Sequence, residues 1–473
     1  MSRVVMFVYN DCTRDARVLR EAAALAAAGH RVTIMARPRD VASTTGDREE
    51  RDGFEIVRVP IPNGWRRTWA WAWYPWRTYG WLGRWVAFRV KSGIRRPPRG
   101  WVEIVVIVVG LVAWVPWAVV RTVAYGIARL VHPERRQSTV EWLVRWRYGI
   151  VGWARAAADA APDADIWHGH DLSGLPGAAR GADRMVAAGG SPRVVYDSHE
   201  LFLESGSNAR RPAWGKRVLA RMERGLSKRA DALVTVNRTL AEALDREYGP
   251  FPRVVVIHNA PARWDPPAER PDHLRRTLGL GPDVPVVLYH GGFSPDRGLV
   301  PLAEAMLAPG LERAHLAYVG FGAMTDELQA LSVEPRFGGR IHVLPAVSQE
   351  DLPAWVASAD VGVMPNQPTT ANERLSTPNK LFESLAAGIP VVTSDYPERR
   401  RIVIDDPDGP LGETCDPTDP LSIGEAIRRI VDLDPAAYRD LRRRCLKAAH
   451  ERWNWETEAE KLVALYADLA TAP

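Results

Sequence analysis

Short apolar runs alternate with helix-length segments, and this alternation occurs twice along the chain. The first series occupies residues 3–9 and 31–36, continues near Ile166, Val194 and Leu233, and ends at residues 254–257. The second series occupies residues 286–289, 316–319, 341–344, 361–364 and 391–393. Strands that alternate with helices form parallel sheets with helices on both faces. The pattern therefore predicts two doubly wound α/β halves facing across a cleft, with ligands bound beyond the carboxyl ends of the strands.

The segment HNAPARWDPPAERP, residues 258–271, is rich in proline and separates the two series. We expect an N-terminal domain over residues 1–262 and a C-terminal domain over residues 263–452. A final amphipathic helix in residues 453–473 is expected to pack back on the N-terminal domain. Three widely spaced cysteines indicate neither a disulfide framework nor a metal cluster, which suits a reducing compartment. The first residues, MSRVVMFVYN, have no long apolar run typical of a secretory signal.

One segment of the N-terminal domain differs in composition from the rest of the chain. Residues 61–155 contain sixteen Arg or Lys and three acidic residues, a local charge of +13, and thirteen of the nineteen tryptophans. The whole chain carries +5, so the remainder carries about −8. We attribute the high arginine content of the chain to coding bias and expect no nucleic-acid partner. The segment therefore reads as an insertion, at about residues 62–155.

The insertion contains an uncharged apolar run at residues 104–120. A membrane-spanning helix needs about 20 residues, and Pro116 would kink a helix here. The strands before and after the insertion must pair in one sheet, so the chain has to return to the side it left. We therefore predict a segment that dips into one leaflet or lies on it, through about residues 65–153. The alternative is a helical subdomain that buries its tryptophans against itself or another subunit.

Residues 376–400 read STPNKLFESLAAGIPVVTSDYPERR and predict a helix followed by a short strand. Thr377 and Pro378 fit the N-cap and the first helical position. The unpaired N–H groups of a helix start attract phosphate, and Asn379 and Lys380 lie there. Glu383, one turn on, can accept hydrogen bonds from a ribose diol. The alternative is an exposed Lys–Glu pair worth ~0.3 kcal/mol.

Two other predicted strands end in glycines, within LYHGGFSPDRGL (288–299) and LAYVGFG (316–322). Glycine lets the backbone approach a ligand closely. The glycines concerned are Gly291, Gly292, Gly320 and Gly322. Arg297, at the expected start of the next helix, can clamp phosphate oxygens bidentately. Three such strand ends in one half, two of them with cations, indicate a nucleoside diphosphate site.

The C-terminal half resembles the donor domain of glycosyltransferases with the GT-B fold, in particular the retaining family 4, of the bacterial cell-envelope polysaccharide type. The similar segments are GGFSPDRGL, YVGFG, IHVLPAVSQEDLPAWVASADVGVMP and TPNKLFESLAAGIPVVTSD. The N-terminal half is similar more loosely, in RDARVLREAAALAAAGHRVTIMA, DADIWHGHD and VVYDSHELF. The resemblance implies two Rossmann-like domains and transfer of a sugar, a hexose type, from a nucleoside diphosphate sugar to an acceptor, with retained anomeric configuration.

The resemblance also implies roles for individual residues. Arg297 matches the basic residue on the donor pyrophosphate, and Glu383 matches the second glutamate of a pair, which holds the ribose. The first glutamate would fall at Leu375, and Phe293 stands where the family usually has an arginine. A Pro-x-Lys-x-x-Glu variant of the family fits this sequence, so we expect Lys380 to supply the lost charge.

His170 matches the histidine near the reacting sugar, and with Arg297 and Lys380 it completes the predicted catalytic set. Departure of a nucleoside diphosphate develops negative charge on the β-phosphate, which fixed cations stabilise. The resemblance therefore implies no cofactor and no metal. Without the family match, His170 would be read as a satisfied histidine at a strand end. His168 is expected to pack or bond locally.

Four residues of the N-terminal half are predicted on the acceptor side of the cleft. Asp15 and Arg17 belong to a helix start that faces the expected cleft, although Asp15 can simply cap that helix. His199 and Glu200 end a strand on the same rim.

Together these features predict sugar addition to a lipid-linked or other glycan acceptor at the cytoplasmic leaflet. The protein would be attached peripherally or monotopically to the inner face of the cell membrane. Two other classes stay open: a GT-B nucleotide-sugar epimerase, and a catalytically inactive scaffold of a polysaccharide assembly complex.

Overall fold

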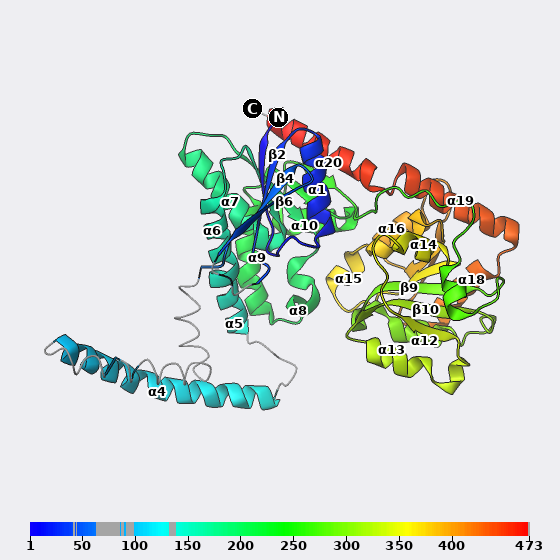
Figure 1. Ribbon diagram of the computed structural model, residues 1–473, viewed down its shortest axis with the longest axis horizontal. Coiled ribbons are helices and arrows are strands. Elements are labelled where there is room, and N and C mark those ends of the chain that lie inside the picture. The colour runs from blue at the N-terminus through cyan, green and yellow to red at the C-terminus, as the bar shows by residue number, and fades with distance from the viewer. Residues whose placement is uncertain are drawn as a thin grey trace.

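The computed structural model describes residues 1–40, 43, 45–62, 86, 89–90, 99–131 and 139–471. The tryptophan-rich segment at residues 63–98, apart from three positions, and the link at residues 132–138 lie outside the described residues. The part of the predicted membrane contact that falls on them therefore stays a prediction. Figure 1 shows two α/β domains beside each other, with the C-terminal helices running from one to the other.

In the described part of the chain, the N-terminal domain contains an eight-stranded sheet in the order β3-β4-β2-β1-β5-β6-β7-β8. Neighbouring strands pair in parallel, except for the antiparallel pair β3 and β4 at one edge. The strands are β1 (Arg3–Phe7), β2 (Arg31–Ala36), β3 (Asp47–Arg51), β4 (Phe54–Arg58), β5 (Ile166–His170), β6 (Arg193–Ser198), β7 (Ala232–Thr235) and β8 (Val254–Val256). The apolar runs predicted all of these except β3 and β4; β3 reads DREER and has no apolar side chain.

Helices cover both faces of this sheet because each buries one apolar stripe. On α1, the buried Val18, Ala22 and Leu25 recur every three or four residues and pack on the strands. The helical elements of this domain are α1 (Ala16–Ala27), α5 (Thr139–Val144), η1 (Arg145–Ile150), α6 (Val151–Ala160), α7 (Asp171–Ala187), η2 (Phe202–Glu204), α8 (Gly206–Ala209), α9 (Ala213–Ser227) and α10 (Arg238–Tyr248).

The C-terminal domain contains a parallel sheet of six described strands, in the order β11-β10-β9-β12-β13-β14. The strands are β9 (Val286–Phe293), β10 (His315–Gly322), β11 (Ile341–Leu344), β12 (Val361–Met364), β13 (Val391–Ser394) and β14 (Gly412–Cys415). The helical elements are α11 (His273–Leu278), η3 (Pro295–Arg297), α12 (Leu299–Ala305), α13 (Thr325–Ser332), η4 (Pro335–Phe337), α14 (Leu352–Ala357), α15 (Ala371–Leu375), α16 (Asn379–Ala386), α17 (Pro397–Val403), α18 (Pro420–Val431) and α19 (Pro435–Glu451). The prediction of two facing doubly wound domains is confirmed.

The last helix, α20 (Trp455–Thr471), leaves the C-terminal domain after α19 and lies on the N-terminal domain beside α1 (Figure 1). Its buried side chains Leu462, Leu465, Tyr466 and Leu469 belong to the same apolar cluster as β1, β2 and α1. At its start, Glu458 accepts hydrogen bonds from the backbone N–H and the ring of His258, 3.0 Å each. This helix, from the C-terminal end of the sequence, therefore completes the core of the N-terminal domain.

Helix α4 (Arg99–Val131) projects away from the N-terminal domain (Figure 1). It continues through Pro116, so the apolar run does not end there. Within residues 104–127, an 18-residue window has a mean hydropathy of 2.3, and among the described residues this is the one helix long and apolar enough to cross a membrane, by length and composition only. Length alone therefore does not exclude a crossing. Because β4 and β5 belong to one sheet, the chain still has to return to the side it left.

The end of the insertion does not project with α4. Trp142, Trp146 and Trp153 are buried, and the indole of Trp153 donates a hydrogen bond to the Val59 carbonyl at 3.1 Å. Elements α5, η1 and α6 pack on α7 and α9, within the domain. The tryptophans of residues 139–153 therefore serve the core of the domain and do not supply aromatic anchors for the predicted membrane contact, which stays a prediction.

Candidate active site between the domains

A cavity of about 510 Å³ lies between the two domains, at the carboxyl ends of strands β9 and β10. Its volume is in the range of small-molecule sites. Of the predicted residues, those that line it are His199, Glu200, Gly291, Gly292, Arg297, Gly320, Asn379, Lys380 and Glu383. Asp15, Arg17, His170 and Gly322 do not line it. The structure thus brings most of the predicted donor residues together at one cavity.

Lys380 is a partly buried cation of the C-terminal wall. It lies in the first turn of α16, which begins at Asn379 with Pro378 as its N-cap, one residue later than predicted. Its ammonium is 4.8 Å from the centre of the Tyr289 ring, and no carboxylate lies within 4 Å of it among the described residues. Burial, and then the neighbouring Arg297 charge, lower the pKa of Lys380 to about 8.

Gly291 is suited to its position by its backbone conformation. Its φ of +107° is unfavourable for other residues, whereas a Cβ there would make only an ordinary van der Waals contact with the Lys380 side chain, 3.7 Å from the ammonium. Gly322 has a different reason to be glycine, because a Cβ there would collide with the backbone of Phe293 on the neighbouring strand. Both glycines were predicted to let the backbone approach a ligand. In the structure Gly291 lines the cavity, whereas Gly322 is needed for the packing of its strand.

Arg297 ends the short turn η3, just before α12. One of its terminal nitrogens lies 3.5 Å from a carboxylate oxygen of Glu373. The same oxygen accepts a hydrogen bond from the Asn366 amide at 2.9 Å. Glu373 lies on α15 and lines the cavity, two positions before the Leu375 at which the family pattern would place a glutamate. Matching the family pattern position by position did not identify Glu373, because only the fold shows that its carboxylate reaches the cavity.

Glu383 is held by His290, a second residue that the sequence reasoning left unassigned. The His290 ring lies 2.8 Å from a Glu383 carboxylate oxygen. Burial alone would raise the pKa of Glu383, but the hydrogen bond from His290 and the nearby Lys380 lower it below its ordinary value. The histidine directly precedes the glycine pair in the quoted LYHGG segment, so its position was available as a signal. An ionised, fixed carboxylate of this kind can accept hydrogen bonds from a diol.

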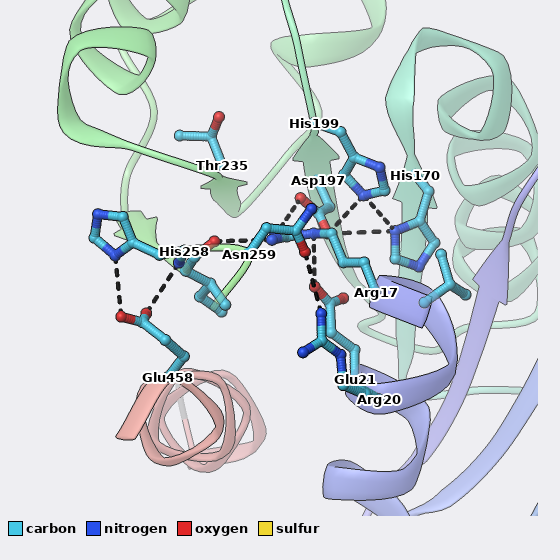
Figure 2. A network of polar contacts seen from close by, with 12 residues as sticks. Arg17, Arg20, Glu21, His170, Asp197, His199, Thr235, His258, Asn259 and Glu458 are labelled. Atoms are coloured by element: carbon cyan, nitrogen blue, oxygen red, sulfur yellow. Dashed lines mark hydrogen bonds and ion pairs between the residues drawn. The ribbon is translucent and has the colours of Figure 1, made fainter. Parts of the chain in front are cut away.

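The N-terminal wall is built around the buried carboxylate of Asp197 (Figure 2). The Arg17 guanidinium lies 3.1 Å from one oxygen, and the other lies 3.2 Å from His170 and 3.3 Å from His199. Arg17 also donates to the Ile257 carbonyl at 2.8 Å. Burial would raise the pKa of Asp197, but Arg17 and His199 hold it well below its usual range.

The two histidines of this network differ in charge, because one ring is neutral and the other is positively charged. Burial and the neighbouring His168 lower the pKa of His170 to about 3, so its ring is neutral. Burial also acts against a charge on His199, but Asp171 and Asp197 raise its pKa to about 10. His199 lines the cavity, whereas His170 is buried behind it, and their rings are 3.2 Å apart. The structure therefore gives His199 the contact with the cavity that was predicted for His170.

Asp15 accepts hydrogen bonds from the Val18 backbone at 3.3 Å and from the Asn10 side chain at 2.7 Å. It is the N-cap of α1, which is the alternative that the sequence had left open. His168 bonds locally, with its ring 2.5 Å from the Tyr466 hydroxyl of α20.

Four buried groups behind this wall each place one possible metal-ligating atom within 4.8 Å of the others; they are Glu21, His168, His170 and Asp197. The Arg17 guanidinium is 2.9 Å from Glu21 and 3.1 Å from Asp197, so both carboxylates already face a positive charge. A divalent cation would stand beside that guanidinium, and like-charge repulsion disfavours this. We therefore assign the cluster to positioning the wall of the cavity.

Hydrogen bonds from side chains of both domains join the two domains at α15. The Asn372 amide oxygen accepts from the Leu201 backbone at 3.0 Å, and the Asn237 amide donates to the Leu375 carbonyl at 2.8 Å. Farther along, the Glu398 carboxylate accepts from the backbone and hydroxyl of Thr239, at 3.0 and 2.7 Å. These contacts place Glu373 and Arg297 opposite His199 and Glu200.

Comparison with known proteins gives matches over both domains. A family model described as "Glycosyl transferases group 1" matches residues 284–432, and one described as "Glycosyl transferase 4-like domain" matches residues 134–260. Glycogen synthase of Mycobacterium tuberculosis is 27% identical over 316 residues, which cover 63% of this chain and 70% of that protein. A GDP-mannose-dependent alpha-(1-6)-phosphatidylinositol monomannoside mannosyltransferase of Mycolicibacterium smegmatis is 26% identical over 291 residues, 59% of this chain and 72% of that protein.

Solved structures show the same fold at lower sequence identity. Sucrose-phosphate synthase from Thermosynechococcus elongatus superposes with a TM-score of 0.64 at 19% identity, over the whole of both chains. HepE of Anabaena in complex with UDP-glucose superposes with a TM-score of 0.59 at 14% identity, over 99% of this chain and 100% of that chain. The arrangement of the two domains is therefore the GT-B fold.

Proposed function

We propose that this chain, which carries both domains of a GT-B glycosyltransferase, transfers a sugar from a nucleoside diphosphate sugar to an acceptor and retains the anomeric configuration. One observation carries the proposal: Lys380 and Arg297 line the same cavity, and Lys380 has no carboxylate partner among the described residues. A partly desolvated cation with no carboxylate within 4 Å is stabilised by a bound anion.

In this mechanism, the C-terminal wall holds the nucleoside diphosphate. Lys380 and Arg297 neutralise the charge that develops on the β-phosphate as its bond to the sugar breaks, and N–H groups at the start of α16 add to this. Glu383, fixed by His290, accepts hydrogen bonds from the ribose hydroxyls. The reaction as proposed uses no metal ion and no other cofactor.

The N-terminal wall faces the transferred sugar and the acceptor. His199 reaches the cavity as an imidazolium, and His170 orients it through the shared carboxylate of Asp197. Glu200 lines the same wall beside His199. Because the charges of this wall are paired with one another, we assign it to neutral hydroxyl groups rather than to the diphosphate.

We also propose a lipid-linked or other glycan acceptor at the cytoplasmic face of the cell membrane, in cell-envelope polysaccharide assembly. Helix α4 supports this, because its valines are exposed over most of its length. The mannosyltransferase relative supports it as well, since its name describes an acceptor that is a phosphatidylinositol glycoside. All three cysteines are free and buried, which suits the cytoplasmic side.

Calorimetric titration of the full chain with UDP-, GDP- and ADP-sugars tests the donor assignment. The proposal expects one base to bind and the nucleoside diphosphate to be released when a lipid-linked acceptor is added. Conversion of the donor alone into another sugar nucleotide would favour the epimerase, and tight binding that depends on Lys380 would argue against the inactive scaffold. Absence of binding to every donor would refute the transferase and the epimerase and favour the scaffold.

Vesicle flotation tests the membrane assignment separately. The variant replaces residues 63–138 with a short Gly-Ser linker and keeps residues 139–153, because their tryptophans belong to the core of the domain. We expect the full chain to float and the variant to stay in solution while it still binds the donor. Equal flotation of the two proteins would overturn the assignment.

A further inference from the structure

Helix α9 presents an exposed stripe that no part of the candidate active site uses. The stripe consists of Trp214, Arg217, Val218 and Arg221, which are spaced three and four residues apart and so lie on one face of the helix. Trp214 is 48% exposed and Val218 is 46% exposed. We call these four residues the α9 stripe. It combines an aromatic ring, an apolar side chain and two positive charges, the composition of a helix that lies at a membrane surface.

The arginines of the α9 stripe differ from those around them. On the same helix, Arg224 pairs with Glu247, and on α10 Arg238 pairs with Glu242 at 3.1 Å. Arg217 and Arg221 are exposed and have no carboxylate partner among the described residues. Their positive charge is therefore uncompensated within the described chain. Anionic lipid headgroups carry the opposite charge and can compensate it.

The start of helix α9 lies at the end of the domain from which α4 projects (Figure 1). Helix α9 packs on α5, where a Cβ at Gly215 would lie 2.4 Å from the Thr139 side chain. Helix α5 is the next described element after α4 along the chain, and Figure 1 places α5 and α8 at the end of the domain nearest α4. A bilayer that receives the exposed valines of α4 therefore lies on the same side of the domain as the start of α9.

Helix α9 is also connected to the acceptor-side wall of the cavity. Its Leu219 belongs to one apolar cluster with Leu203 of η2, and its Lys216 pairs with Glu204 of η2 at 2.7 Å. Element η2 follows directly after His199 and Glu200, which line the cavity. Helix α9 therefore packs directly against the segment that follows the acceptor-side residues of the cavity.

We propose that the α9 stripe is a second membrane-contact surface, which docks on the anionic headgroups of a bilayer and turns the acceptor side of the cleft toward it. The two arginines contact lipid phosphates, while Trp214 and Val218 enter the interface. This inference rests on the proposed function for the membrane, and it adds a contact outside the insertion at residues 62–155. Helix α4 would tether the protein, and the α9 stripe would set its orientation.

The experiment labels single cysteines in the full chain with an environment-sensitive fluorophore. The native cysteines are all buried, so V218C provides the reactive site on the stripe. V333C is the matched control, because Val333 is a 79% exposed valine in the C-terminal domain. On vesicles with 30% phosphatidylglycerol, we expect quenching of the V218C label by aqueous iodide to fall at least threefold, while quenching of the V333C label stays unchanged.

A V218C label that stays as accessible as V333C on floating protein would overturn the inference and leave the proposed function intact. Protection of both labels would also contradict it, since the stripe would not be the oriented face. Failure of the chain to float would refute both membrane assignments, whereas donor binding by calorimetry tests the enzymatic proposal independently.

The charge requirement is tested with R217E/R221E against the control R276E/R439E. All four arginines are exposed and have no carboxylate partner among the described residues, and each double variant changes the net charge by the same amount. We expect only R217E/R221E to restore iodide access to the V218C label on anionic vesicles. Equal access in both variants, or equal protection on vesicles of phosphatidylcholine alone, would contradict recognition of anionic lipid.

Discussion

The two walls of the cleft handle charge in opposite ways. In the N-terminal wall, Arg17, Asp197 and His199 compensate one another within hydrogen-bonding distance, and only the edge of this network reaches the cavity. In the C-terminal wall, Lys380 is partly buried at the cavity, and no carboxylate lies within 4 Å of its ammonium among the described residues. A compensated network can position neutral groups, whereas an uncompensated cation needs an anion. The difference indicates which wall receives the diphosphate and which receives hydroxyl groups.

The largest expected effect comes from breaking the compensated wall. Arg17→Ala leaves the carboxylate of Asp197 buried without its main partner, so we expect the free energy of unfolding to fall by roughly 3–5 kcal/mol. Urea denaturation measures this. Arg3→Ala is the control, because Arg3 pairs with Asp165 at 2.7 Å but both side chains are about half exposed. Its cost should stay below about 1 kcal/mol; equal costs would remove the contrast between buried and exposed pairs.

Lys380→Met should show the opposite behaviour. We expect it to leave the free energy of unfolding unchanged or to raise it, because it removes a partly desolvated charge that has no carboxylate within 4 Å. Calorimetry should show that affinity for the nucleoside diphosphate falls by roughly 10- to 150-fold, the value of a charged hydrogen bond. Lys447→Met, at a surface lysine paired with Asp408, is the control and should bind normally. A destabilised Lys380→Met that still binds tightly would contradict the comparison.

The pKa of Lys380 makes this contrast dependent on pH. In the free protein, Lys380 is protonated below its pKa of about 8 and loses its charge as the pH rises through that value. Bound diphosphate favours the charged form, so affinity should be constant below about pH 8 and then weaken by up to about tenfold per pH unit. Titrations from pH 6.5 to 9.5 measure this. Lys380→Arg should flatten the profile, since arginine stays charged; an unchanged profile in this variant would assign the titration to another group.

The smallest expected effect on binding concerns the ribose diol of the nucleotide, which Glu383 is proposed to contact. Glu383→Gln should weaken binding of the ribonucleoside diphosphate by about 1 kcal/mol, roughly fivefold, because the fixed carboxylate is lost as an acceptor. The same variant should bind the 2′,3′-dideoxy analogue as the unmodified protein does. Glu304→Gln, at a surface glutamate paired with Arg336, serves as the control. Equal losses for both nucleotides would show that Glu383 supports the wall rather than the ribose.

The donor wall was largely predictable from the sequence because its residues are close together in the chain. Lys380 and Glu383 lie one helical turn apart, and Gly291 and Gly292 lie at the end of β9, a few residues before Arg297. The acceptor wall was not, because its central contacts join Arg17 to Asp197 and Ile257, far apart in sequence. Only the folded domain brings together α1, the end of β6 and the segment after β8, on which these groups lie.

Other features were missed for identifiable physical reasons. Strand β3 is a charged edge strand, so apolar periodicity could not reveal it. Glu373 reaches the cavity from α15, outside the register that predicted a glutamate at position 375. The segment that contains the tryptophans at 142, 146 and 153 is as rich in Trp and Arg as the rest of the insertion. Only the packing in the structure shows that these three side chains are buried in the domain.

A crystal structure of the full chain with its nucleoside diphosphate sugar tests the central claim most directly. The account predicts that the β-phosphate contacts the Lys380 ammonium and the Arg297 guanidinium, with the sugar directed toward His199. A diphosphate bound instead to the N-terminal wall, away from both cations, would contradict it.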